Sequence, residues 1–245
     1  MCFDQAQYDL RCEWGLPGIE TLAPLSDAVV IVDVLSFSTA VDVAVANGAC
    51  VLPYRWKDES AAEFAREKHA LLASGRSASG VYSLSPASLV SIPAGTALVL
   101  PSPNGSTLSL ATHGTAAFAG CLRNAPAVAR QASQVGRRIA VIPAGECWSD
   151  GSLRPSLEDL IGAGAVLAGL PGTKSPEAEL AVAAFERFRL NLADALAECG
   201  SGRELIERGF ARDVELAAEY SVSATAPFLS GDRFAGRPPH TPGLD

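Results

Sequence analysis

The chain has 245 residues, a formal net charge of −8 and 48% hydrophobic residues. This length allows a buried core in one large domain or in two small ones. The acidic balance argues against a nucleic-acid-binding protein, which needs a basic surface to displace counterions from phosphates. A small anionic ligand remains open, because a few buried arginines or a metal ion can set the local field.

The cysteines and the N-terminal segment indicate the compartment. Six cysteines are present, none in a Cys-x-x-Cys pair, so we interpret them as free thiols, with disulfides as the alternative. Residues 1–10 lack the apolar stretch of a signal peptide, and no apolar run is long enough to span a bilayer. We expect a cytoplasmic protein without nucleic-acid or membrane partners, and leave a homodimer open.

Apolar runs of strand length alternate with helical patterns along the chain. The predicted strands cover 28–34, 50–54, 96–100, 115–119 and 138–142. The predicted helices cover 38–47 and 60 to about 73, start near 106, 124 and 156, and fill most of 175–220. Ser60 and Glu63 have the spacing of a capping box, which places a helix start at Ser60. Residues 76–95, rich in Ser, Gly and Pro, are predicted to form a long surface loop.

This alternation predicts an α/β fold with α/β/α layers and a largely parallel sheet. We expect a single domain over 1–230, with two closely packed α/β subdomains as the alternative. A flexible tail is predicted over 231–245, because the chain after Pro227 is rich in Gly and Pro and holds few apolar residues.

Polar residues suited to binding a ligand follow the predicted strands directly. They are Asp33 and Ser36, then Asn104, Gly105 and Ser106, then Arg123 and Asn124, then Glu146, with Glu158 and Asp159 at the next helix start. Ligands of open α/β sheets bind outside the carboxyl ends of the strands. We therefore expect these segments, distant in sequence, to converge on one pocket.

Asp33 ends an apolar run, where a carboxylate is costly unless it is paired or bound to a metal. It is interpreted as a metal ligand or a phosphoryl acceptor, with a helix N-cap or a salt-bridged core residue as the alternative. Leu35 stands where haloacid dehalogenase-type phosphatases carry a second Asp, so that family is excluded.

Two other segments are suited to holding an anion. Gly105 lets the backbone approach a ligand closely, and helix N-terminal amides favour negative charge; the alternative is an ordinary Asn-Gly turn with a Ser cap. Arg123 offers a planar fork that matches phosphate, sulfonate or carboxylate oxygens. Its alternative is a surface Arg beside a helix cap, where a salt bridge contributes less than ~1 kcal/mol.

The carboxylates Glu146, Glu158 and Asp159 would repel one another at a common rim and raise one another's pKa. A divalent cation relieves this repulsion, and Mg²⁺ prefers a few carboxylates, waters and substrate oxygens. For Glu158 and Asp159, simple stabilisation of the helix dipole is the alternative. The three histidines show no ligand spacing, which disfavours a zinc site and a His-based triad.

Taken together, the motifs resemble those of the 2-phosphosulfolactate phosphatase family and occur in the family's order. They are Val30-Ile-Val-Asp33-Val-Leu, Asn104-Gly105-Ser106, Cys121-Leu-Arg123-Asn124-Ala, Ala144-Gly-Glu146 and Leu157-Glu158-Asp159-Leu, followed by Ser201-Gly-Arg-Glu-Leu and Asp213. The resemblance implies an α/β fold peculiar to that family. It also implies Mg²⁺-dependent hydrolysis of 2-phosphosulfolactate to sulfolactate and phosphate, a step of coenzyme M biosynthesis.

The expected mechanism is metal-assisted hydrolysis of a small anionic phosphate ester. Mg²⁺ is expected on Asp33 with Glu146 or Asp159. The substrate is expected to contact Ser36, Asn104, Gly105, Ser106, Arg123 and Asn124. Glu158 is expected to orient water or to protonate the leaving oxygen. The nucleophile stays open between water and Asp33.

The chain departs from the family pattern at two places. Ser36 stands where the family has the Arg of Asp-Val-Leu-Arg, and Gly75-Arg76 stands where it has Gly-Glu-Arg. Two alternatives follow from the lost positive charge. The protein could bind a phosphorylated or sulfonated metabolite without hydrolysing it, or it could hydrolyse a different 2-phospho acid.

Overall fold

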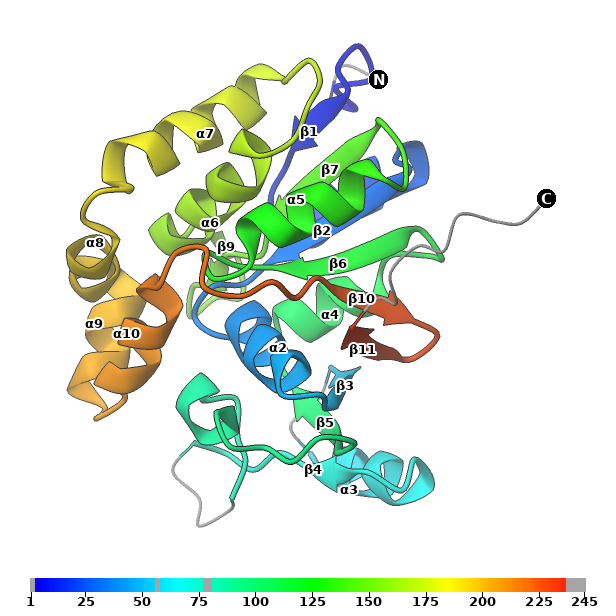
Figure 1. Ribbon diagram of the computed structural model, residues 1–245, viewed down its shortest axis with the longest axis vertical. Helices are drawn as coiled ribbons and strands as arrows, with labels where there is room; N and C mark the ends of the chain where they lie inside the picture. The colour runs from blue at the N-terminus through cyan, green and yellow to red at the C-terminus, as the bar shows by residue number, and fades with distance from the viewer. Residues whose placement is uncertain (1–2, 56–57, 77–80, 237–245) are drawn as a thin grey trace.

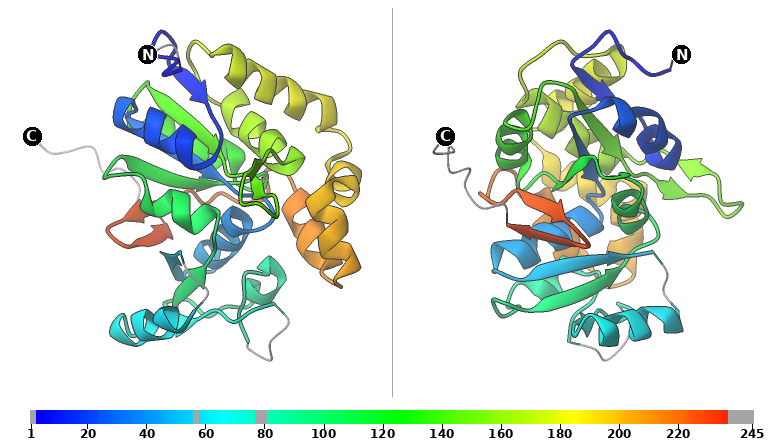
Figure 2. Two further views of the ribbon diagram at one scale, coloured as in Figure 1. Left: turned by 180° about the vertical axis from the view of Figure 1, so that it is seen from behind. Right: turned by 90° about the vertical axis from the view of Figure 1, so that its right-hand side faces the viewer.

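The computed structural model describes residues 3–55, 58–76 and 81–236, and shows one large sheet with helices on both faces (Figure 1). The strands of the sheet are, in spatial order, β1 (Leu10–Cys12), β7 (Ile139–Pro143), β2 (Ala28–Val32), β6 (Ala116–Gly120), β10 (Pro227–Ser230), β11 (Arg233–Gly236), β3 (Cys50–Tyr54), β5 (Ala97–Pro101) and β4 (Leu71–Leu72). A separate antiparallel pair, β8 (Glu146–Cys147) and β9 (Leu153–Arg154), extends away from the sheet (Figure 2).

The helices follow the strands in the alternation expected of an α/β fold. They are α1 (Gly15–Leu22), α2 (Phe37–Ala46), α3 (Glu59–Glu67), α4 (Gly105–Leu110), α5 (Ala125–Ser133), α6 (Leu157–Ala168), α7 (Pro176–Phe188), α8 (Leu192–Glu198), α9 (Gly200–Glu207) and α10 (Ala211–Ala218). Helices α5, α6 and α7 lie over one face of the sheet (Figure 1), and α1 and α4 lie over the other (Figure 2). The predicted α/β/α layers and the helical region 175–220 are confirmed.

The sheet is largely parallel, as predicted, but it consists of two parallel parts. The first part is β1-β7-β2-β6 and the second is β3-β5-β4. The β10–β11 hairpin joins them through three successive antiparallel pairings. These pairings reverse the direction of the second part relative to the first, so the carboxyl ends of all strands do not share one edge.

Strand β2 shows why this sequence forms a central strand. All five residues are apolar and buried, four of them β-branched, which suits a strand covered on both faces. Val30 and Val32 pack into the cluster that includes residues of α5 and α6, while Val29 and Ile31 pack into the cluster with α1. The two-residue period of a strand thus supplies both cores from one segment.

The helix expected over 60–73 begins and ends elsewhere. Its N-cap is Asp58, whose Oδ1 accepts a hydrogen bond from the Ser60 amide at 3.0 Å, so the predicted capping box at Ser60 is wrong. Helix α3 ends at Glu67, because His69 has a positive φ of 50° that turns the chain into β4.

The tail predicted from residue 231 is also corrected. Strands β10 and β11 lie in the middle of the sheet, where Phe228 packs against Phe118 and Phe234 against Phe37, with ring centroids 5.2 and 6.1 Å apart. These two aromatic residues give the segment enough apolar surface to order it between the two parallel parts. Residues 237–245 lie outside the described residues.

The short elements β1, α1, β8 and β9 were not predicted, because three residues or fewer leave little periodicity and α1 contains Pro17 and two glycines. The five cysteines in the described part of the chain are free thiols. No helix there combines the length and apolar character needed to cross a membrane.

Candidate active site

A cavity of about 180 Å³ lies where the turns after β2, β5 and β7 meet helix α9. The polar side chains that line it include Asp33, Ser36, Arg76, Asn104, Glu146 and Arg208. Four of these were expected from their positions after strands, and they do converge. Asn104 reaches the cavity from the second part of the sheet, although β5 runs opposite to β2.

Asp33 connects the two parts of the sheet. Its Oδ1 accepts a hydrogen bond from the Phe37 amide at 3.1 Å, at the start of α2, and its Oδ2 accepts from the Gly105 amide at 2.9 Å. Asp33 therefore lies at the expected pocket. The N-cap of α2 is Ser36, so Asp33 is not the helix N-cap of the alternative, although it accepts from the first amide of the helix. Burial raises the pKa of Asp33 and the charge of Glu158 adds to that rise, while the two amides and Arg76 oppose it.

Gly105 allows this approach because it has no side chain. A Cβ added to Gly105 would lie 2.2 Å from Cδ1 of Phe37, which no real contact permits. The turn after β5 can therefore pack directly on the start of α2 and bring its amide to Asp33. Gly105 thus supports the carboxylate from behind; the side chain facing the cavity from this turn is Asn104.

Glu146 faces the same cavity from the first residue of β8. Its Oε2 accepts a hydrogen bond from Asn104 Nδ2 at 3.0 Å. Burial raises the pKa of Glu146 to about 7, and the charges of Asp33 and Glu158 act in the same direction, against Asn104 and Arg154. The carboxylates of Asp33 and Glu146 therefore lie in one small cavity, and their negative charges are not fully neutralised by neighbouring groups, as expected for a site that binds a cation.

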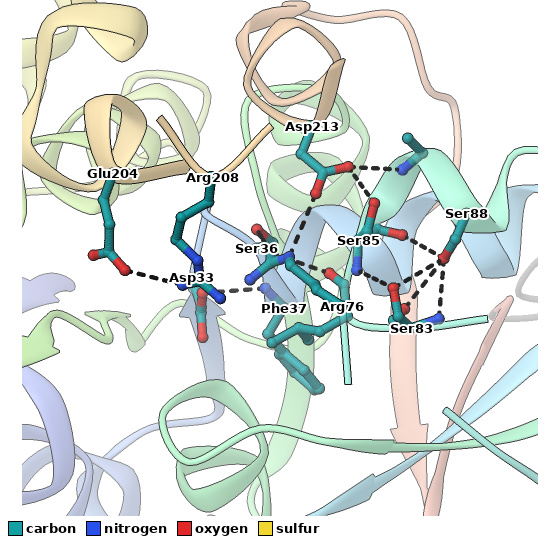
Figure 3. Close-up of polar contacts among 12 residues, drawn as sticks. Asp33, Ser36, Phe37, Arg76, Ser83, Ser85, Ser88, Glu204, Arg208 and Asp213 are labelled. Atoms are coloured by element: carbon teal, nitrogen blue, oxygen red, sulfur yellow. Dashed lines mark hydrogen bonds and ion pairs between the residues drawn. The ribbon is translucent and has the colours of Figure 1, made fainter. Parts of the chain in front are cut away.

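Two arginines supply positive charge to the cavity. Arg76 donates from Nη2 to the Ser36 hydroxyl and, at 3.4 Å, to the Leu84 carbonyl (Figure 3). Arg208, which follows α9, donates from Nη1 to Glu204 Oε1 at 3.0 Å and is half exposed. The sequence prediction noted Gly75-Arg76 only as a departure and missed Arg208. Its position after the Ser201-Gly-Arg-Glu-Leu motif was the one available signal.

Arg123 and Asn124 are not brought to this cavity, contrary to expectation. Arg123 donates from Nε to Asp42 Oδ2 at 3.1 Å and from Nη1 to Glu219, so its charge is neutralised by two carboxylates. Asn124 accepts from the Cys121 amide at 2.9 Å and donates to the Ala119 carbonyl. These contacts fix the β6–α5 turn and use the groups that a ligand would need.

The acidic pair at the start of α6 also has a different placement from the one expected. Asp159 accepts hydrogen bonds from the Val34 amide at 2.7 Å, the Gly145 amide at 2.9 Å and the Ser156 hydroxyl at 2.8 Å. It holds the turns after β2 and β7 together and does not line the cavity, which corrects its assignment as a metal ligand. Burial, with the charges of Asp33 and Glu158, raises the pKa of Asp159 well above its usual range.

Glu158 and Ser106 lie behind the cavity surface. Glu158 is buried and its Oε2 accepts from the Cys199 thiol at 3.3 Å, so it acts on Asp33 and Glu146 through its charge and does not line the cavity. Ser106 is fully buried, and its hydroxyl donates to the Leu100 carbonyl at 3.0 Å. Neither residue takes the direct substrate contact or proton-transfer position expected of it.

Among the described residues, no three His, Cys, Asp or Glu side chains come together as a ready metal site. Three carboxylates line the cavity. Glu204 is paired with Arg208, which leaves Asp33 and Glu146, and Glu146 accepts a hydrogen bond from the Asn104 amide. Sites that bind Mg²⁺ together with a substrate phosphate commonly use only one or two carboxylates, so this pair fits that ion. The arginines complement the oxygens of an anionic ester.

Comparison with known proteins adds a family to this geometry. The family model described as 2-phosphosulpholactate phosphatase matches residues 19–232, a range that contains every residue of the cavity. A 2-phosphosulfolactate phosphatase of Methanothermobacter thermautotrophicus is 28% identical over 210 residues, covering 85% of this chain and 89% of that protein. A probable 2-phosphosulfolactate phosphatase of Carboxydothermus hydrogenoformans is 32% identical over 208 residues, covering 82% and 85%.

Proposed function

The chain belongs to the 2-phosphosulfolactate phosphatase family, and from this premise we propose that it is a phosphoric monoester hydrolase. Its proposed substrate is 2-phosphosulfolactate or a close 2-phospho acid, cleaved to the hydroxy acid and phosphate. The observation that carries this proposal is the pairing of Asp33 and Glu146 with Arg76 and Arg208 in one cavity. Carboxylates that can hold a cation and guanidinium groups that can hold an anion are the two requirements of metal-assisted phosphoryl transfer.

We propose Mg²⁺ as the cofactor, with Asp33 and Glu146 as its protein ligands. When bound, such an ion supplies Lewis-acid polarisation of the phosphoryl oxygens and neutralises developing charge. The two backbone amides on Asp33 hold its carboxylate in one orientation, and Asn104 does the same for Glu146. Preorganised ligands of this kind cost no reordering when substrate enters.

The remaining residues of the cavity position the ester. Ser36 replaces an arginine of the family pattern, but its hydroxyl accepts from the Arg76 guanidinium, so an arginine still reaches this place. Arg76 matches the arginine of the family's Gly-Glu-Arg, and together with Arg208 it keeps positive charge in the cavity despite Ser36. This supports hydrolysis of an acidic ester over the alternative of a protein that binds its ligand without turning it over.

Phosphate release tests this function directly. The wild-type protein should release phosphate from 2-phosphosulfolactate in the presence of Mg²⁺, and excess EDTA should abolish the release until Mg²⁺ is restored. Without turnover, a rise in melting temperature with the ester would instead indicate a binding protein. A panel of other 2-phospho acids ranks the substrates. Release that is insensitive to EDTA would contradict the metal-assisted mechanism.

We further propose a cytoplasmic location and a step of the coenzyme M biosynthesis type. The five described cysteines are unpaired, as thiols remain in a reducing compartment. The relatives' names supply the substrate on which the pathway assignment rests.

A further inference from the structure

Asp213 is a buried carboxylate on α10 that does not line the reaction cavity. Its Oδ1 accepts hydrogen bonds from the Ser85 hydroxyl and, at 3.1 Å, from the Ala87 amide, so it ties α10 to the middle of the segment predicted as a long loop over 76–95 (Figure 3). Its Oδ2 faces Arg76 Nε at 3.5 Å. One oxygen of this carboxylate thus binds the segment around Ser85, and the other pairs with Arg76.

Arg76 is held largely by this carboxylate and by Ser36. Its side chain is 13% exposed, and within the described part of the chain its Nε and Asp213 Oδ2 have no hydrogen-bond partner, so the ion pair is the contact recorded for these two atoms. A buried guanidinium without a fixed counter-charge would be costly, and its many rotamers would not keep it at the cavity. The Asp213 charge therefore decides where the Arg76 guanidinium lies.

Arg208 is held beside Arg76 by the ring of Phe210. The Phe210 centroid lies 5.6 Å from Arg76 Cζ and 5.9 Å from Arg208 Cζ, within the range of cation–π contacts. The corner between α9 and α10 thus presents two guanidinium groups around one ring. Asp213 pairs with Arg76 and Glu204 pairs with Arg208, each through one contact. Because a guanidinium has five N–H donors, both arginines can still bind an anionic group.

Both guanidinium groups stand where the reaction cavity meets a larger one. Arg76 and Arg208 line the cavity of about 180 Å³ and also an adjoining cavity of about 720 Å³. Of these two cavities, Asp33 and Glu146 line the smaller one, where the metal and the phosphate are proposed to bind; Glu146 also lines a separate cavity beside α1. 2-Phosphosulfolactate carries a carboxylate and a sulfonate besides its phosphate, so with the phosphate at Asp33 and Glu146 it would direct one of these two groups toward the arginines.

We propose that Asp213 is a positioning residue that fixes Arg76 so that Arg76 and Arg208 bind one of the non-phosphate acidic groups of the substrate. This inference rests on the proposed function, since it assigns a second subsite to the same cavity. The group bound there is a sulfonate or a carboxylate, because both present planar or tripodal anionic oxygens to a guanidinium. Asp213 itself does not touch the reacting atoms.

The variant Asp213→Asn separates the two tasks of the carboxylate. The amide oxygen can still accept from Ser85 and Ala87, while the amide NH₂ faces Arg76 and no longer holds it. Loss of a charge-assisted contact should raise KM for 2-phosphosulfolactate at least about tenfold, with kcat changed by less than about threefold. KM for glycerol 2-phosphate, which has no second acidic group, should stay within about twofold of the wild-type value.

Three comparisons make the result specific. Arg76→Gln should reproduce the KM effect, and the Asp213→Asn/Arg76→Gln double variant should be no worse than Arg76→Gln alone, because the pair acts as one unit. Ser85→Ala loosens the loop contact but leaves Arg76 paired, so its KM should stay near wild type. Arg208→Gln should raise KM for the acidic ester, whereas Arg203→Gln, at an exposed position of α9, should not. A parallel series with 2-phospholactate distinguishes the carboxylate from the sulfonate.

Several outcomes would overturn the inference. They are an equal KM increase for acidic and neutral esters, additive effects in the double variant, or a Ser85→Ala variant that matches Asp213→Asn. Should wild type show no turnover, the proposed function fails on its own. Titration calorimetry of the intact ester in EDTA then tests the subsite separately. Wild type should bind 2-phosphosulfolactate at least about tenfold more tightly than Asp213→Asn does, and equal affinities would reject the subsite.

Discussion

The turns after β2 and β6 are neighbours in the sheet, and each carries a charged residue that the sequence places at a ligand site. Asp33, in the first turn, lines the cavity with a carboxylate held by two backbone amides. Arg123, in the second, is paired with Asp42 and Glu219 and lies outside the cavity. Both residues therefore follow a strand directly. The partners supplied by distant parts of the chain decide which of the two faces the cavity.

The two turns also differ in electrostatic balance. Asp33 is surrounded by other acids, so Glu158 adds to the rise in its pKa and its own charge raises the pKa of Glu146 and Asp159. Arg123 instead offsets the burial that raises the pKa of Asp42, together with the Ser223 hydroxyl. Unbalanced charge in one turn marks a binding site, and balanced charge in the other marks a structural link.

The largest expected effect is on catalysis by Asp33→Asn. The amide cannot serve as an anionic metal ligand, so we expect phosphate release to fall at least about 1,000-fold. The free energy of unfolding should change by only about 1 kcal/mol, which is the net contribution of one hydrogen bond. Phosphate-release kinetics and urea denaturation measure the two quantities, with Asp232→Asn as a surface control. Wild-type turnover in Asp33→Asn would remove this residue from the mechanism.

Arg123→Gln should show the opposite pattern. It leaves Asp42 buried without its cation, so we expect the free energy of unfolding to fall by about 3 kcal/mol. Specific activity of the folded protein should remain within about twofold of wild type, because Arg123 does not line the cavity. Denaturation curves and single-temperature kinetics test this. If instead activity collapsed at unchanged stability, the contrast between the two turns would be lost.

Gly105→Ala tests how closely the two parts of the sheet must approach. The new methyl group collides with Phe37, so we expect a loss of about 2 kcal/mol in unfolding free energy from overpacking. Displacement of the Gly105 amide from Asp33 should also lower kcat about tenfold. Gly236→Ala is the control, since its Cβ would meet only Val45 Cγ1 at 3.9 Å. Equal effects of the two substitutions would contradict the close-approach argument.

The smallest effect is a pH dependence of stability in the metal-free protein. The pKa of Glu146 is about 7 when folded, against 4.5 ordinarily, so its favourable contribution exists at low pH and is lost as pH rises through 7. Between pH 6 and 8 in EDTA, we expect unfolding free energy to fall by about 1 kcal/mol from this group. Glu146→Gln should remove that part of the slope, and saturating Mg²⁺ should reverse it. If the pH dependence of the unfolding free energy were unchanged in Glu146→Gln, another titrating group would be its cause.

Local patterns were sufficient for much of the fold. The strand predicted over 50–54 coincides with β3, and those over 28–34, 96–100, 115–119 and 138–142 match β2, β5, β6 and β7 within two residues. Helix starts near Ser156 and Ser175 were also correct. Apolar runs and capping residues act over a few positions, so one segment carries enough information to specify them.

The site shows the limit of such patterns. Asp33, Ser36, Asn104 and Glu146 follow strands that meet near one cavity, which made them predictable as a group. Arg123 also follows a strand directly, as these residues do. The acids that neutralise it come from α2 and from the chain after α10. Pairing across that distance in sequence leaves no local signature.

The chain's composition and periodicity thus predict its layers, most of its strands and the acidic residues that follow them. Folding in three dimensions decided the rest. The β10–β11 hairpin enters the middle of the sheet because Phe228 and Phe234 find aromatic partners there. Arg76 and Arg208 meet at the cavity, with Asp213 paired to Arg76 behind it, because burial and charge pairing act on distances through space, whatever the separation along the chain.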